Sequence, residues 1–199
     1  MAVAKRLVFP SKMQVEVEEF EIPDDPKPGE VIVENLCSLI SPGTELAMFT
    51  ETHIGFPIPD FTYASFPFRP GYATVGRAAK VGFGVDDIAE GDVIFTRNGH
   101  ESHTLVRTSR PIHKAPPGMA VQHVPFAALA QIALTAVRVT DTRLGFTAAV
   151  FGQGLIGNLA AQLLQRAGAL RVVGIDVMQH RLDLSAQCHI DSQINPAHT

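Results

Sequence analysis

The chain has 199 residues, enough for one large domain or two modest ones. Hydrophobic residues make up 46% of it and charged residues 18%, as is typical of a globular protein that buries a core. The net charge of −4 argues against nucleic acid and anionic membranes as partners, and Cys37 and Cys188 are too far apart for a cysteine zinc knuckle or a disulfide framework.

The first 120 or so residues carry the signals of a β-rich domain. Short apolar or alternating runs are separated by turns rich in glycine and proline. We expect strands at Lys5–Phe9, Gln14–Glu21, Glu30–Ile40, Tyr72–Val81 and Gly91–Phe95. Regularly spaced short strands of this kind predict a barrel or a sandwich.

The pattern changes to alternating strands and helices after Pro125. We expect helices at Ala127–Val139, Leu155–Ala167 and Met178–Gln187, and strands at Thr147–Phe151, Arg171–Ile175 and Ser192–Ile194. The run Thr147–Phe151 is apolar throughout, as in a central strand of a parallel sheet. A β-rich part followed by a βαβ unit predicts a mixed α/β chain.

A glycine-rich turn joins the first strand of this βαβ unit to its helix. The turn comprises Gly152, Gln153, Gly154, Leu155, Ile156 and Gly157, a GxGxxG pattern in its full strand–turn–helix context. Gly152 permits the tight turn, Gly154 allows phosphates to approach the backbone, and Gly157 allows the helix to pack on the strand. The free N–H groups of the helix then face a pyrophosphate, which predicts a Rossmann-type dinucleotide site.

Asp176 follows Gly157 by 19 residues, at the end of the second strand. A carboxylate at this place accepts hydrogen bonds from the adenosine ribose and repels a 2′-phosphate, so NAD is favoured over NADP. Arg181 is either a phosphate contact or a solvated surface charge. The alternatives are a glycine-rich turn without a ligand, or a site for FAD or S-adenosylmethionine, against both of which the preceding β domain argues.

Five segments occur together in one order, namely Pro28–Val33, Ile40–Glu45, Arg69–Gly76, Glu90–Phe95 and Gly152–Gly157. In this the chain resembles the medium-chain dehydrogenase/reductase superfamily of zinc-type alcohol dehydrogenases and quinone reductases, with the bacteriochlorophyllide dehydrogenase branch the most similar. The resemblance implies a GroES-like β-barrel catalytic domain with a hinge helix over 1–141. The N-terminal half of a Rossmann domain would then span 142–199, with substrate in the cleft between the two.

The chain departs from the family at the catalytic zinc. Ser41 stands where a zinc cysteine would fall, Tyr72 where a histidine ligand would fall, and Gln131 where a third ligand often stands. These residues lack the thiolate, imidazole or carboxylate that zinc prefers, and the cysteine-rich lobe for a structural zinc is missing. We therefore expect a zinc-free member.

The candidate catalytic residues are Thr44, which matches the hydroxyl proton relay of the family, and Tyr72, whose phenol would donate a hydrogen bond to a substrate oxygen. The alternatives are a local backbone cap for Thr44 and a packed ring for Tyr72. We expect a structural hydrogen bond for Glu45. We expect no metal at His100 and His103, although one of them could act as an acid or base.

Residues 49–68 are rich in aromatic side chains, namely Phe49, Phe56, Phe61, Tyr63, Phe66 and Phe68. They form either an apolar wall over a hydrophobic substrate or a long loop packed on the barrel. The sequence alone leaves both interpretations open.

The chain reaches only the third strand of a six-stranded Rossmann sheet, so the first strand should be an edge. This leads to two hypotheses: an NAD(P)-dependent oxidoreductase, of which the chain is a fragment or truncated form, and a non-catalytic module completed by a partner chain. We expect a small, apolar substrate acting as alcohol, carbonyl or activated alkene. We also expect a cytoplasmic protein, since no run is long enough for a membrane span, and an oligomer not formed through the usual sheet edge.

Overall fold

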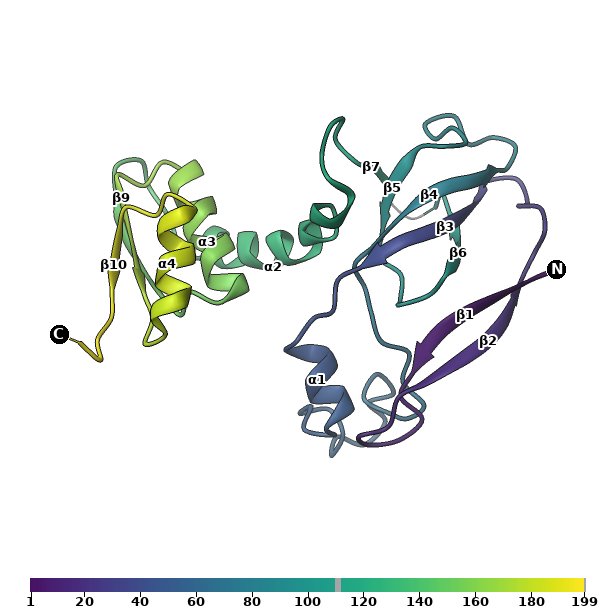
Figure 1. Ribbon diagram of the computed structural model, residues 1–199, viewed down its shortest axis with the longest axis horizontal. Coiled ribbons are helices and arrows are strands. Elements are labelled where there is room, and N and C mark those ends of the chain that lie inside the picture. The colour runs from purple at the N-terminus through teal and green to yellow at the C-terminus, as the bar shows by residue number, and fades with distance from the viewer. Residues whose placement is uncertain (110–111, 199) are drawn as a thin grey trace. The chain divides into compact units, whose positions relative to one another are not determined.

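The computed structural model describes residues 1–109 and 112–198. They form two compact units, Met1–Phe126 and Ala127–Thr199. Figure 1 shows the strands of the first unit in purple to teal and the helices and strands of the second in green to yellow. The domain boundary that we expect after residue 141 stays a prediction. Within the described part of the chain, no helix is both long and apolar enough to span a membrane.

The first unit consists of antiparallel sheets. Strands β1 (Ala2–Val8) and β2 (Glu16–Ile22) pair as a hairpin. A five-stranded sheet has the order β6-β3-β4-β5-β7, formed by β3 (Glu30–Ser38), β4 (Thr74–Val81), β5 (Val93–Thr96), β6 (His103–Arg107) and β7 (His113–Lys114). Helix α1 (Thr44–Phe49) follows β3, and a 3₁₀ turn spans Val121–His123.

The expected β domain is therefore present, but the pairing of the described strands does not close it into a barrel. Strands β6 and β7 are the two edges of the larger sheet. The sheet is held by a core of aliphatic side chains, with Val31, Val33 and Ile94 fully buried at its centre. Burial of such a cluster is the main driving force for folding of this unit.

The hairpin packs on the sheet through Ala4 and Ile22, which contact Ile32. It is also tied to the segment before β6 by backbone hydrogen bonds, because the Leu7 N–H donates to the His100 carbonyl and the Ser102 N–H donates to the Lys5 carbonyl. This junction fixes the backbone of residues 100–102 between two sheets.

The second unit is a three-stranded parallel sheet of order β10-β9-β8 with its helices. Its elements are α2 (Phe126–Val139), β8 (Thr147–Phe151), α3 (Leu155–Arg166), β9 (Arg171–Ile175), α4 (Gln179–Gln187) and β10 (Ser192–Ile194). All six agree with the sequence-based expectation to within one residue. Helix α3 contacts the sheet by burying Ala161 and Leu164 against Val172. It ends at a turn where Gly168 has a φ of 99°, a conformation that glycine adopts without strain.

Strand β8 is an edge of the described sheet, as predicted from the sequence. Its only neighbour there is β9, and its side chains alternate between exposed and half-buried. Phe151 is 79% exposed as a result. The apolar sequence of this strand predicts two covered faces, whereas the unit supplies neighbours on one side only.

Candidate functional site

The glycine-rich turn between β8 and α3 has the conformation that its sequence predicts. Gly152 has a φ of 84°, in the left-handed region, and its N–H donates to the Ile175 carbonyl at 2.7 Å. A Cβ at residue 157 would overlap the carbonyl oxygen of Gly152, so only glycine fits there. A Cβ at residue 154 would meet nothing within 4 Å, which leaves open space beside the start of α3.

The first turn of α3 presents backbone donors next to this space. Leu155 and Ile156 begin the helix, and their N–H groups have no acceptor one turn earlier in it. Both side chains are 38% exposed, so this end of the helix is accessible. Backbone donors and the positive end of the helix dipole are what a pyrophosphate requires.

The side chain of Gln153 points inward rather than toward a ligand. Its Nε2 donates to the Val150 carbonyl at 2.9 Å, and its Oε1 accepts from the Ser185 hydroxyl at 3.0 Å. It lies over Gly174, where any Cβ would be 2.9 Å from the Gln153 amide carbon. The side chain of Gln153 thus stabilises the turn from the inside, and only its backbone is available to a ligand.

Asp176 fixes the other end of the turn. Its buried carboxylate accepts the Met178 N–H on Oδ1 at 2.8 Å and the Gln153 N–H on Oδ2 at 2.7 Å. The Met178 N–H, together with the Gln153 N–H and the Arg181 guanidinium, holds the pKa of Asp176 below its usual value. An ionised carboxylate has further lone pairs on both oxygens, so it can still accept hydrogen bonds from a ribose.

Arg181 lies beside this carboxylate on α4. Its Nη1 is 3.6 Å from Asp176 Oδ2, and its side chain is 46% exposed. The guanidinium therefore places a positive charge at the acidic end of the turn, instead of extending into solvent away from it.

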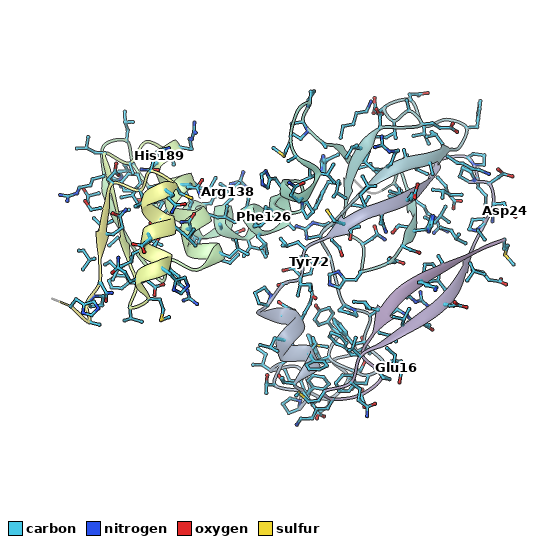
Figure 2. All side chains as sticks on the ribbon, viewed as in Figure 1. Glu16, Asp24, Tyr72, Phe126, Arg138 and His189 are labelled. Atoms are coloured by element: carbon cyan, nitrogen blue, oxygen red, sulfur yellow. The ribbon has the colours of Figure 1, made fainter. Side chains whose placement is uncertain are left out.

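Ser41 and Tyr72 are brought together in the first unit, although they are 31 residues apart. The Tyr72 hydroxyl donates to Ser41 Oγ at 2.7 Å. Ser41 is buried just before α1, and Tyr72 is half-buried just before β4; Figure 2 labels Tyr72 close to α1. Gln131 lies on α2 in the second unit.

This pair does not fit a catalytic zinc site. A hydroxyl and a phenol are not among the thiolate, imidazole and carboxylate ligands that zinc takes in proteins. No group of three or more histidine, cysteine, aspartate or glutamate side chains is placed to hold a metal among the described residues.

Glu45 and His100 form a buried pair next to Ser41. His100 Nε2 is 2.8 Å from Glu45 Oε2, with each side chain 6% exposed, and His100 Nδ1 is 2.7 Å from Ser38 Oγ. The other carboxylate oxygen of Glu45 accepts the Ser41 N–H at 3.0 Å. The hydrogen bonds expected for Glu45 are present, but its pairing with His100 was not predicted. Thr44, the first residue of α1, is half-buried next to it.

An apolar groove of about 390 Å³ lies against this pair. Its lining consists of Leu7, Phe9, Val15, Ile40, Pro42, Leu46, Phe49 and Pro70, with Glu45 and His100 as its ionisable members. The groove lies entirely within the first unit.

The aromatic segment after α1 packs largely on itself. The tilted rings of Phe56 and Phe66 have centroids 5.2 Å apart, and Tyr63 contacts Phe68 edge-on at 5.8 Å. Burial raises the pKa of the Tyr63 phenol, and the nearby Tyr72 and Glu45 add to this shift. These contacts favour the packed-loop interpretation while placing Tyr63 near the Ser41–Tyr72 pair.

Several known proteins are similar to the chain. No family model matches the chain. The D-guloside 3-dehydrogenase of Escherichia coli K12 is 33% identical over 135 residues, which cover 66% of this chain and 38% of that protein. A zinc-binding dehydrogenase from Sinorhizobium meliloti bound to NADP superposes with a TM-score of 0.81 at 20% identity, over 100% of this chain and 64% of that one. An Escherichia coli alcohol dehydrogenase complexed with NADH gives 0.79 at 20% identity, over 100% and 64%.

The chain is similar in sequence and in fold to proteins of the medium-chain, zinc-type alcohol dehydrogenase superfamily. Its fold matches the GroES-like part and a portion of the Rossmann part of these proteins. It spans well under half the length of the D-guloside 3-dehydrogenase and about two thirds of the superposed chains.

Proposed function

We propose that the chain is part of an NAD-dependent oxidoreductase that acts without zinc on an alcohol, a carbonyl or an activated alkene. The Tyr72–Ser41 hydrogen bond of 2.7 Å carries this proposal, because it joins hydroxyl groups at two positions where the family has zinc ligands. We also propose that the chain is most similar to the branch of bacteriochlorophyllide dehydrogenases and that it is located in the cytoplasm.

The residues of the glycine-rich turn fit the adenosine and pyrophosphate half of the cofactor. The N–H groups at the start of α3 would bind the pyrophosphate, and Gly154 leaves room for its approach. Asp176 would accept hydrogen bonds from the ribose hydroxyls. The bound nicotinamide supplies or accepts a hydride.

Two charges act in opposite directions on the choice between NAD and NADP. The Asp176 carboxylate would repel a 2′-phosphate, whereas the Arg181 guanidinium, 3.6 Å from it, would attract one. Asp176 is held ionised by two backbone donors as well as by Arg181, so its negative charge persists. We propose a preference for NAD that Arg181 reduces.

Tyr72 would act at the substrate oxygen. Its phenol donates to Ser41 Oγ here, and a substrate oxygen near that place would accept the same hydrogen bond. A donor at this position stabilises the negative charge that develops on a carbonyl oxygen during reduction. In the direction of alcohol oxidation, the substrate hydroxyl proton would leave through Tyr72 or through Thr44.

The groove beside Glu45 supports a small, apolar substrate. Its lining is aliphatic and aromatic apart from Glu45 and His100, and apolar pockets with few polar groups are typical of small-molecule sites. We place the apolar part of the substrate on this lining.

A second candidate function is a nucleotide-binding module without turnover, completed by a partner chain. It is favoured by the exposed edge strand β8, where Phe151 is 79% exposed, and by Leu144, which is 91% exposed. Unpaired strand edges and apolar surface are typical of sites that another chain covers. An oligomer formed there would differ from the usual dimer of the family.

Turnover separates the two functions. The chain, freed of metal with a chelator and then assayed with and without added zinc, is tested for hydride transfer between NADH and aldehydes, ketones and quinones. If the chain is part of a zinc-independent oxidoreductase, we expect turnover that added zinc does not increase. Turnover that requires zinc contradicts zinc independence, and NADH binding without turnover by a folded sample favours the module.

A further inference from the structure

His100 lies at a junction of several segments near Tyr72. Its backbone N–H donates to the Pro70 carbonyl at 3.0 Å, and its backbone carbonyl accepts the Leu7 N–H at 2.9 Å. Gly71, which follows Pro70, packs so closely that a Cβ there would lie 2.6 Å from the backbone nitrogen of His100. The main chain that leads into Tyr72 therefore rests directly on the backbone of His100.

The side chain of His100 reaches the hydrogen-bond acceptor of Tyr72 by a second route. Its Nε2 contacts Glu45, and Glu45 in turn accepts the Ser41 N–H. The Glu45 N–H also donates to the Ser41 carbonyl at 3.1 Å, so residues 41 and 45 are tied in both directions. Ser41 is thereby held in one orientation, with its Oγ toward Tyr72.

The buried pair is a costly way to hold a turn if packing were its only purpose. Removing a carboxylate and an imidazole from water is unfavourable, and apolar side chains of similar volume are often at least as stabilising. The pair instead fixes the orientation of both side chains, since both ring nitrogens and both carboxylate oxygens have defined hydrogen-bond partners.

We propose that Glu45 and His100 are positioning residues that set the orientation of the Tyr72 phenol through Ser41. This inference rests on the proposed role of Tyr72 and assigns the pair a part in that same site. A carboxylate accepts hydrogen bonds only, so the pair fixes a proton on His100 Nε2, while Nδ1 is hydrogen-bonded to the Ser38 hydroxyl. Changing either partner frees the turn at residue 41 and with it the acceptor of Tyr72.

The composition of the chain allows a direct test. It contains two tyrosines, Tyr63 and Tyr72, so ζ-carbon labelling of tyrosine gives two resonances, which Tyr63→Phe assigns. The spectrum is recorded for Glu45→Gln and His100→Gln. Two matched controls are Glu30→Gln, which alters a buried carboxylate in the sheet, and His103→Gln, which alters a half-buried histidine bonded to Ser102.

We expect the Tyr72 resonance to shift or broaden in Glu45→Gln and in His100→Gln and to stay in place in both controls, with circular dichroism unchanged. An unmoved Tyr72 resonance in both folded variants overturns the inference. If His100→Gln fails to fold, Ser38→Ala loosens the ring at Nδ1 alone and must still move the Tyr72 resonance. The tyrosine resonances can be recorded without turnover. Full activity of Tyr72→Phe would therefore reject the proposed function of Tyr72, whereas the positioning role of Glu45 and His100 is decided by the spectra.

Discussion

The phenol of Tyr72 donates a hydrogen bond to the hydroxyl of Ser41 at 2.7 Å, although the two residues are 31 positions apart in the sequence. Ser41 is itself held by Glu45, and Glu45 by His100. A connected set of hydrogen bonds thus joins these four residues.

Replacing Tyr72 by phenylalanine tests the catalytic donor. If the phenol polarises the substrate oxygen, kcat falls by about a hundredfold or more, while the ring still packs and the fold is retained. Steady-state kinetics with NADH and the best substrate measures this. Tyr63→Phe is the matched control and should lose much less activity; equal losses in both variants would argue against a special role for Tyr72.

Asp176→Ala tests the ribose contact. Loss of hydrogen bonds to a charged acceptor costs about 1.5–3 kcal/mol, so NADH should bind about ten- to a hundredfold more weakly. Isothermal titration calorimetry gives the two affinities. Asp183→Ala, an exposed carboxylate on α4, should bind NADH as the unaltered chain does. An unchanged affinity of Asp176→Ala would remove the ribose assignment.

Two glycines of the turn should respond differently to alanine. Gly157→Ala places a methyl group on the Gly152 carbonyl, so we expect a loss of about 1–3 kcal/mol in the free energy of unfolding. Gly154→Ala meets no atom within 4 Å and should fold normally while binding NADH more weakly. Thermal denaturation followed by calorimetric titration distinguishes the two effects. Normal stability of Gly157→Ala would mean that the turn is not packed as described.

Glu18 makes the first unit sensitive to acid. Hydrogen bonds from Arg6 and Arg69 lower the pKa of Glu18 from 4.5 to about 2. Because the pKa of Glu18 is lower in the folded chain than in the unfolded chain, ionised Glu18 stabilises the fold at pH values above about 4.5. This stabilisation is lost as the pH falls from about 4.5 toward 2.

Glu18→Gln should therefore show a smaller loss of stability over this pH range than the unaltered chain. Urea denaturation at several pH values measures it. Glu16→Gln, an exposed carboxyl on the same strand, serves as the control. Identical pH profiles for the unaltered chain and Glu18→Gln would contradict the assigned ion pairs.

The sequence predicted the second unit closely because its signals are local. The apolar face of α3, the glycines at 152–157 and the glycine at 168 each act within a few residues. Helix α1 was missed, since six residues are too few to show a helical period. The edge position of β8 was predicted from the three strands that the sequence shows, whereas its apolar run alone indicates a central strand.

The candidate site was predictable only in part. Ser41 and Tyr72 were singled out by their family positions, and Asp176 by its spacing from the turn. The pairing of Glu45 with His100 joins residues 55 apart, and their contact arises from the junction of the hairpin with the sheet. The inward orientation of the Gln153 side chain was not predicted. It depends on the space that Gly174 leaves by lacking a side chain and on the hydroxyl of Ser185 in a later helix.

The most direct test of the account is a calorimetric titration of the purified chain with NADH and, separately, with NADPH. We expect saturable binding of NADH at one site per chain, with NADPH binding more weakly because of Asp176. A folded sample that shows no saturable binding of either nucleotide would contradict it.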